Sequence, residues 1–319
     1  MRPIDEGGGA MSGRALVLMN GQAGGVLQRG AKTTEEEVRS ALADAGYDVE
    51  MRCLEPGDME AAIADAARRT DLTVLIAGGG DGTLSMAASM LAGRDVALGC
   101  LPLGTMNLYC RSLGMPLDPA EAARSLGAGH FESVDLGEVN GRTFLHHVSI
   151  GLQPAIVARR NRENFRGRLG KMLATAKTAI RALRNPRTLD VTLEISGRRE
   201  RHLAPALFVT SNPLLRRTPG LAQSRSAHRL GIYICKSTRW DDLVQLGAAT
   251  LLAGPEANEN LDVREESEVA IERNHRRSKG FQASIDGEIV RFGSPMRITC
   301  RRGALRLLVP NDVPNDVPK

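Results

Sequence analysis

The stretch "LIAGGGDGTLSMAASML", residues 75–91, places four glycines and one acid between two segments of regular structure. Residues 72–77 form a short apolar run typical of a buried strand, and residues 83–91 are rich in Ala, Met and Leu, which is typical of a helix. The glycines therefore lie at a strand-to-helix turn, where exposed N–H groups and the helix dipole favour an anion. A tight turn needs only one glycine, whereas a run without side chains lets a phosphate approach closely. The stretch predicts a phosphate site around Asp81.

Strands and helices alternate through the first half of the chain. This alternation predicts a parallel α/β sheet, whose ligands bind at the carboxyl ends of the strands. The expected strands are 14–20, 47–54, 72–77 and 96–104, and the expected helices are 33–46, 57–69, 83–91 and 119–129.

The second half is predicted to be mainly antiparallel β structure, because short strand-like runs and hairpin turns replace the alternation after about residue 130. A chain of 319 residues is longer than one core usually grows, so two domains are expected. The expected organisation is a flexible leader (1–13), an α/β domain (14–132), a β-sandwich domain (133–310) and a flexible tail (311–319).

Composition excludes several classes of protein. Aromatic residues make up only 3% of the chain, which argues against recognition of single-stranded nucleic acid by stacking. No apolar run reaches the roughly 18 residues that span a bilayer, and the first residues lack the apolar stretch of a secretory signal. The five cysteines are far apart and form no CxxC pair, so neither a disulfide framework nor a zinc site is indicated. A cytoplasmic location is predicted.

Two common nucleotide-binding patterns are absent. The segment "GVLQRGAKT" (25–33) approaches a P-loop, but Ala31 separates Gly30 from Lys32, and that loop needs its lysine directly after the glycine. The first strand is not followed by GxGxxG, so the dinucleotide pattern of hydride-transferring enzymes is missing as well.

Three further segments carry polar groups at expected strand ends. "MNGQAGG" (19–25) closes the first strand with a glycine-rich turn, and "LPLGTMNLYCRSLGMP" (101–116) follows another strand with Gly-Thr. "ASIDGEIV" (283–290) runs from a strand into an Asp-Gly-Glu hairpin. By itself, that hairpin is an ordinary turn.

Taken in order, the four segments resemble the diacylglycerol kinase catalytic-domain family of bacterial lipid kinases, which is related to sphingosine kinases and more distantly to NAD kinases. That family carries an Asn-Gly turn, GGGDGT, an LPxGTxN segment and a C-terminal DGE. Here these are residues 20–25, 78–83, 102–107 and 286–288. The resemblance covers nearly the whole chain.

The resemblance implies a lipid kinase in which the α/β domain binds ATP, the β-sandwich domain binds the acceptor, and Mg²⁺ bridges the phosphates. It implies Asp81, Glu288 and Asp286 as catalytic residues, and the sequence leaves open whether Asp81 or Glu288 is the base. The residues that it implies for ATP are Asn20, Gly24, Gly25, Gly78, Gly79, Gly80, Gly82, Thr83, Thr105 and Asn107.

One departure concerns a metal. The family often has an acidic loop, linked in some members to a structural Mg²⁺, where this chain reads "SAHRLGIYI" (226–234). His228 and Arg229 replace acids there, although Asp135 matches a family position. We therefore expect no structural metal site.

Residues 159–187 hold ten Lys or Arg and one acid. Within them, the apolar residues of 168–184 fall in an arc of roughly 120° on a helix. Either this helix packs on its own domain, or it docks on anionic lipid while its long basic side chains reach the head groups. Kinase chemistry on a lipid favours peripheral membrane contact. No module that reads nucleic acid accompanies the charge.

The leading hypothesis is an ATP-dependent lipid kinase that phosphorylates a hydroxyl of a diacylglycerol-like or related lipid. The alternatives are an enzyme like NAD kinase and a nucleotide- or lipid-binding protein without catalysis. The Asp-Gly-Glu hairpin and the GTMN segment favour a lipid kinase over NAD kinase.

Overall fold

A computed structural model describes residues 13–152, 154, 188–211, 228–239, 260–274 and 280–311. The chain divides into two compact units, Met1–Val134 with Ala304–Lys319, and Asp135–Gly303. The amphipathic helix expected over 168–184 lies outside the described residues. Among the helices that are described, none has the length and apolar character needed to cross a membrane.

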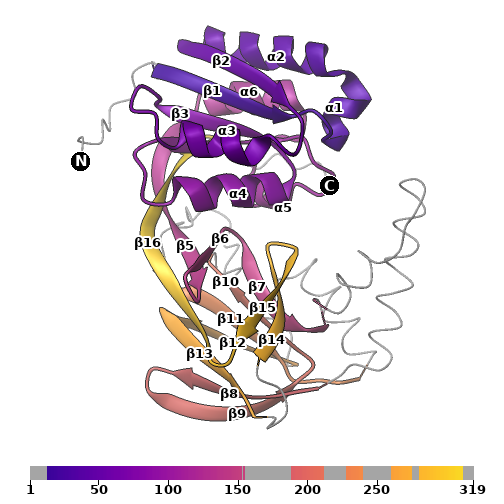
Figure 1. Ribbon diagram of the computed structural model, residues 1–319, viewed down its shortest axis with the longest axis vertical. Helices are drawn as coiled ribbons and strands as arrows, with labels where there is room; N and C mark the ends of the chain where they lie inside the picture. The colour runs from indigo at the N-terminus through magenta and orange to yellow at the C-terminus, as the bar shows by residue number, and fades with distance from the viewer. Residues whose placement is uncertain are drawn as a thin grey trace. The chain divides into compact units, whose positions relative to one another are not determined.

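The first unit is built on a parallel sheet with helices on both faces (Figure 1). Helices α2 and α6 contact each other, as do α3 and α4. The strand order is β2 (Tyr47–Leu54), β1 (Gly13–Asn20), β3 (Val74–Gly79), β4 (Ala97–Pro102) and the last residues of β16 (Met296–Val309). The helices are α1 (Gly24–Arg29), α2 (Ala31–Asp44), α3 (Met59–Ala66), α4 (Asp81–Leu91), α5 (Leu108–Ser112) and α6 (Pro119–Gly127).

The central strands β3 and β4 are buried along their whole length. A parallel strand covered on both faces needs a continuous apolar run rather than an alternating one, and "VLIAGG" and "ALGCLP" meet that need. Two short helices, α1 and α5, were not predicted, because each spans only five or six residues and lacks an apolar period.

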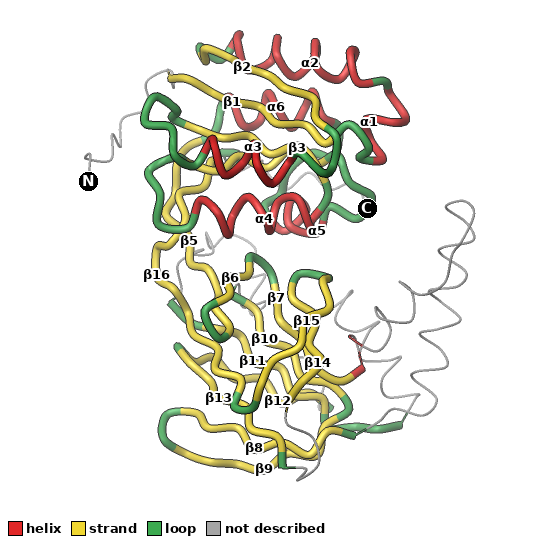
Figure 2. The backbone as a smooth tube through the Cα atoms, in the orientation of Figure 1, coloured by secondary structure: helices red, strands yellow, loops and turns green. Residues whose placement is uncertain are grey.

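The second unit contains two antiparallel sheets (Figure 2). Their facing sides share one apolar core, which includes Phe144, Val148, Ile150, Ile271 and Ile298. One sheet has the order β12 (Leu261–Glu266), β11 (Leu230–Cys235), β10 (Ala206–Thr210), β7 (His147–Gly151), β14 (Gly280–Ile285) and β15 (Glu288–Gly293). The other runs from β16 through β13 (Glu268–Arg273) and β8 (Leu189–Ile195) to β9 (Arg198–Ala204), and is accompanied by β5 (His130–Val139) and β6 (Arg142–Phe144).

The predicted fold class is confirmed: a parallel α/β sheet precedes a mainly antiparallel β region. The last strand differs from the expected layout. β16 starts beside β13 in the second unit, whereas its end pairs in parallel with β4 through Leu307 and Leu98. Leu305, Leu307 and Leu308 are fully buried there, because β4 needs an apolar neighbour on its open edge.

Candidate functional site

The ends of β3 and β4 meet through glycine backbones. β3 ends at Gly79 and α4 begins at Asp81, and a Cβ atom added to Gly104, beyond β4, would lie 2.4 Å from the Cα of Gly80. A Cβ on Gly78 would lie 2.8 Å from Leu103 Cδ1, and one on Gly79 would lie 2.5 Å from Thr83 Oγ1. Packing within the protein therefore explains Gly78 and Gly79 of the run and the facing Gly104.

Gly82 is different. A Cβ atom at this position would meet nothing within 4 Å, and its φ is not positive, so neither packing nor backbone conformation requires a glycine. It lies in the first turn of α4, where Thr83 N and Leu84 N donate to Gly80 O, and the N-cap Gly80 supplies no side chain to bind the N–H groups that precede them. The absence of a side chain in an open helical turn fits a ligand that contacts the backbone, and the helix dipole favours an anionic one.

The turn after β1 is tied to the same strand ends. Gly25 N donates to Leu103 O at 2.9 Å, and Gly21 N donates to Leu54 O at 2.8 Å. The side chain of Asn20 closes the turn, since its Oδ1 accepts from Gln22 N at 3.0 Å. The predicted segment 20–25 is thus held beside the turn that follows β4.

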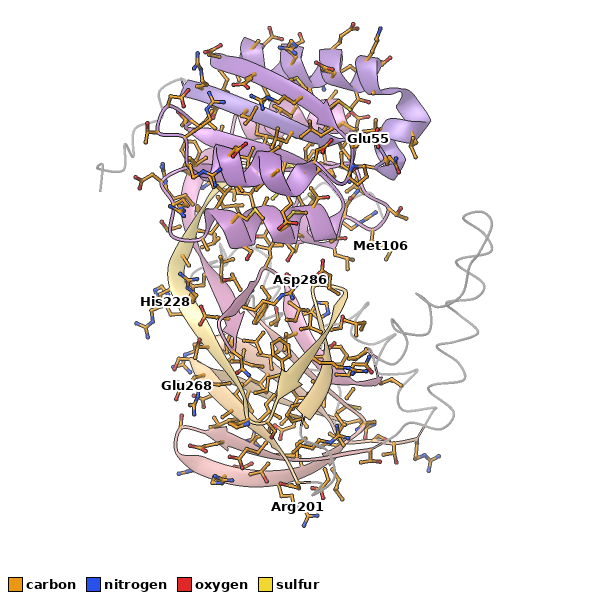
Figure 3. All side chains as sticks on the ribbon, in the orientation of Figure 1. Glu55, Met106, Arg201, His228, Glu268 and Asp286 are labelled. Carbon is orange, nitrogen blue, oxygen red and sulfur yellow. The ribbon has the colours of Figure 1, made fainter. Side chains whose placement is uncertain are left out.

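Asn107 shapes the turn after β4. It is buried with φ 49°, and its amide accepts from Gly104 N at 2.9 Å and donates to Gly104 O at 3.2 Å. Thr105 is exposed, as is its neighbour Met106 (Figure 3). Both residues are predicted to bind ATP. Thr105 faces solvent, whereas the side chain of Asn107 is bonded to the backbone of Gly104.

Asp81 joins the two predicted segments of the first unit. Its Oδ1 accepts from Tyr109 N at 3.0 Å, which fixes the start of α5 to the start of α4. Two buried thiols lie nearby: burial raises the pKa of Cys110 to about 12, and burial also raises that of Cys100, with the charge of Asp81 contributing to both. Both thiols therefore stay neutral at physiological pH, which excludes thiolate chemistry from this end of the sheet.

Asp286 is held by backbone donors. At the turn between β14 and β15 (Figure 3), with φ 46°, its Oδ2 accepts from Leu145 N at 2.8 Å. Its Oδ1 accepts from His146 N at 2.9 Å and from His147 N at 2.8 Å. Three N–H groups on one carboxylate make Asp286 an anchor between this hairpin and the start of β7.

Glu288, two residues further on, is open to solvent. Its side chain is 66% exposed and pairs with Arg142 Nη2 at 2.6 Å. The two predicted acids of the hairpin thus lie in different environments: backbone N–H groups hold the carboxylate of Asp286, whereas that of Glu288 is exposed and paired with an arginine. Sequence reasoning missed Arg142, because it comes from a separate hairpin and no spacing links it to Glu288.

Asp135 lies at the position where the family resemblance suggests a structural Mg²⁺. Its buried carboxylate accepts from His228 N at 2.6 Å and from Gly303 N at 2.8 Å, and His228 Nδ1 lies 3.1 Å from both oxygens. Burial and the charge of Asp135 raise the pKa of the Cys300 thiol to about 12. Donors of the chain itself occupy this carboxylate, so the residues present do not fit a divalent cation.

The structure thus gathers the predicted residues into two groups. In the first unit, segments 20–25, 78–83 and 105–107 meet at the carboxyl ends of β1, β3 and β4. In the second unit, Asp286 and Glu288 share one hairpin. Among the described residues, no group of three or more His, Cys, Asp or Glu side chains is arranged to hold a metal ion.

Comparison with known proteins decides the family. Residues 14–139 match the family model of the diacylglycerol kinase catalytic domain. The "Probable lipid kinase YegS-like" proteins of Pseudomonas fluorescens and Pseudomonas aeruginosa are each 32% identical to the chain, over 91% of its length and 96% and 95% of theirs. The chain belongs to this lipid kinase family.

A solved structure agrees in fold. A proposed diacylglycerol kinase from Bacillus anthracis matches with a TM-score of 0.72 at 23% identity, over 94% of this chain and 98% of that one. The resemblance to the family is therefore confirmed, and the chain is a kinase. The roles of its individual residues remain predictions.

Replacing Asp286 with Ala is expected to lower the free energy of unfolding by about 3 kcal/mol or more, because three partly buried N–H groups lose a charged acceptor. Asp286→Asn should lose less, since Oδ1 and its two bonds are kept and Asn tolerates positive φ. Urea denaturation measures both. Equal stability of Asp286→Ala and the parent would contradict the anchoring role.

Removal of divalent cations by EDTA is expected to leave the melting temperature unchanged, because donors of the chain already occupy the carboxylate of Asp135. Asp135→Asn should lower it, since hydrogen bonds to a charged acceptor contribute about 1.5–3 kcal/mol each. The exposed Asp58→Asn serves as the matched control and should behave like the parent. Differential scanning fluorimetry with EDTA or Mg²⁺ tests this, and a chelator-dependent fall in melting temperature would disprove it.

Proposed function

We propose that this kinase transfers the γ-phosphoryl group of ATP to a hydroxyl of a diacylglycerol-like lipid. The observation that carries the nucleotide part is Gly82 in the open first turn of α4, a position where neither the φ angle nor any neighbour in the described part of the chain requires a glycine. The lipid part rests on the family to which the chain belongs.

The residues of the first unit suit the binding of phosphates. N–H groups of the first turn of α4 would hold phosphate oxygens, and the exposed hydroxyl of Thr105 would add a donor. Asp81 gives one carboxylate oxygen to Tyr109, and its other oxygen would hold Mg²⁺ or accept the proton of the acceptor hydroxyl. Mg²⁺ supplies neutralisation of the developing phosphate charge, which is the main demand of phosphoryl transfer.

The residues of the second unit suit different tasks. The carboxylate of Asp286 accepts hydrogen bonds from three N–H groups, and these bonds orient its hairpin. Glu288 is exposed and pairs with Arg142 through Oε2, so its other oxygen, Oε1, would accept the proton of the acceptor hydroxyl. We therefore retain Asp81 and Glu288 as the two candidate bases and assign Asp286 a positioning role.

Contact with anionic membranes through residues 168–184 is part of this proposal. Its support is the sequence: a lipid acceptor resides in a bilayer, and this segment combines an apolar arc with basic residues.

The test is incubation of the full-length protein with radiolabelled ATP, Mg²⁺ and either a bacterial lipid extract or NAD. Label is expected in lipid. Label in NADP alone would favour the NAD kinase alternative, and binding of ATP without any transfer would favour a non-catalytic protein.

Asp81→Asn should lower the rate of lipid labelling by about 10²–10⁴ with the melting temperature retained, because the amide oxygen still accepts from Tyr109 N while the charge is lost. A rate within a few-fold of the parent would exclude Asp81 as a catalytic residue.

Gly82→Ala is expected to weaken ATP binding about tenfold or more without loss of stability, because the added methyl group meets only the ligand. Helical stability should be equal or higher, since Ala is favoured over Gly in a helix by about 0.5–1 kcal/mol. Gly57→Ala is the matched control, because a Cβ there also meets nothing within 4 Å. Calorimetric titration with a non-hydrolysable ATP analogue measures the affinity of each variant. An unchanged affinity in Gly82→Ala would show that phosphate does not bind at this turn.

A further inference from the structure

The six-stranded sheet of the second unit has two chemically different faces. One face lies in the apolar core and carries Val148 and Ile150 of β7 and Ala283 and Ile285 of β14. Residues alternate between faces along a strand, so Ser149, between Val148 and Ile150, points to the opposite face. Ser284 lies between Ala283 and Ile285 and points the same way.

The register of the strands places these two serines side by side. Ser149 is paired directly with Ser284 on β14 and with Phe208 on β10. Continued across the sheet, the row reads Val263, Tyr233, Phe208, Ser149, Ser284 and Ile289. None of these residues is charged, and the two hydroxyls lie between larger apolar side chains.

Both hydroxyls are buried without a partner. Ser149 and Ser284 are each 0% exposed, and neither Oγ has a hydrogen-bond partner among the described residues. A buried polar group left unpaired costs about 1–3 kcal/mol. Two adjacent cases in one row call for an explanation, because most buried polar side chains in native proteins are hydrogen-bonded.

The surroundings indicate what the hydroxyls bind. Facing residues on neighbouring strands have Cβ atoms about 4.5–5.5 Å apart, so one oxygen atom between the serines is within reach of both. A carbonyl oxygen accepts two hydrogen bonds and satisfies both serine donors at once. The absence of charge in the row favours such a neutral acceptor over a phosphate or carboxylate.

The neighbours of the pair suit an apolar chain. Phe208 packs with Ala206, Cys235 and Leu152 in a small apolar cluster on this face. Phe208, Ile289 and the adjacent Gln282 are each partly or fully exposed, so a ligand reaches the pair by displacing side chains rather than strands.

We propose that Ser149 and Ser284 bind an ester carbonyl of the glycerolipid acceptor and so determine its specificity. The inference rests on the proposed function, because that function supplies the acylated acceptor. Ser284 pairs with Ile289, the residue that follows the candidate base Glu288, so the serine pair belongs to the same hairpin as that base.

The experiment compares two lipids that differ only in the carbonyl groups, 1,2-dioctanoylglycerol and 1,2-dioctylglycerol, the second being an ether. Binding of each radiolabelled lipid to the full-length protein is measured in detergent micelles without ATP. The parent is expected to prefer the ester by about 5- to 10-fold, the contribution of one to two neutral hydrogen bonds. Ser149→Ala and Ser284→Ala should each reduce this preference, and the double variant should abolish it through weaker ester binding with ether binding unchanged.

Stability separates this role from a structural one. Removal of an unpaired hydroxyl should leave the melting temperature equal or higher. Ser211→Ala is the matched control, because that buried serine donates to Leu145 O at 2.8 Å. It should lower the melting temperature and keep the ester preference. An unchanged ester preference in the double variant, or no preference in the parent, would overturn the proposal.

The outcome is distinguishable from failure of the proposed function. If the parent binds the ester preferentially but phosphorylates neither lipid with ATP and Mg²⁺, then the kinase proposal fails, and the carbonyl site stands as a lipid-binding site. If both lipids are phosphorylated equally and bound equally, the kinase proposal stands and the carbonyl site fails.

Discussion

The contact between the backbones of Gly80 and Gly104 is the constraint on which the rest of the first unit depends. The ends of β3 and β4 approach so closely only because Gly104 has no side chain, since a Cβ on Gly104 would lie 2.4 Å from the Cα of Gly80. This approach brings the turn after β4 against the start of α4. Asp81 can then accept from Tyr109 N, and the exposed Thr105 lies in the turn that follows the same strand. One steric condition thus brings together the turns at the carboxyl ends of β3 and β4.

The carboxylates of the chain divide by what they already bind. Asp135 and Asp286 each accept hydrogen bonds from two or three backbone N–H groups, so these two carboxylates hold loops in place. Asp81 and Glu288 each have an oxygen to which no backbone group of the described residues donates. A general base needs a carboxylate oxygen that can accept a proton, and for this reason Asp81 and Glu288 are the two candidate bases.

Much of this could be predicted from the sequence. The apolar runs before each glycine-rich turn correctly located β1, β3 and β4, since a buried parallel strand has a strong local signal. The return of β16 to β4 could not be predicted, because "ALRLLVP" would be equally apolar in either sheet. Contacts such as Tyr109 with Asp81, or Arg142 with Glu288, join residues 28 and 146 positions apart, and no spacing in the sequence encodes them.

The same limit explains why the serine pair escaped the sequence analysis. Ser149 and Ser284 look like ordinary polar positions within strands, where one face is expected to meet water. Only the register shows that they are neighbours, and only burial shows that neither meets water. A motif marks residues that share a short segment, such as 78–83. A binding site made of single residues from separate strands leaves no motif, so it becomes visible only when unpaired polar atoms are counted across the folded sheet.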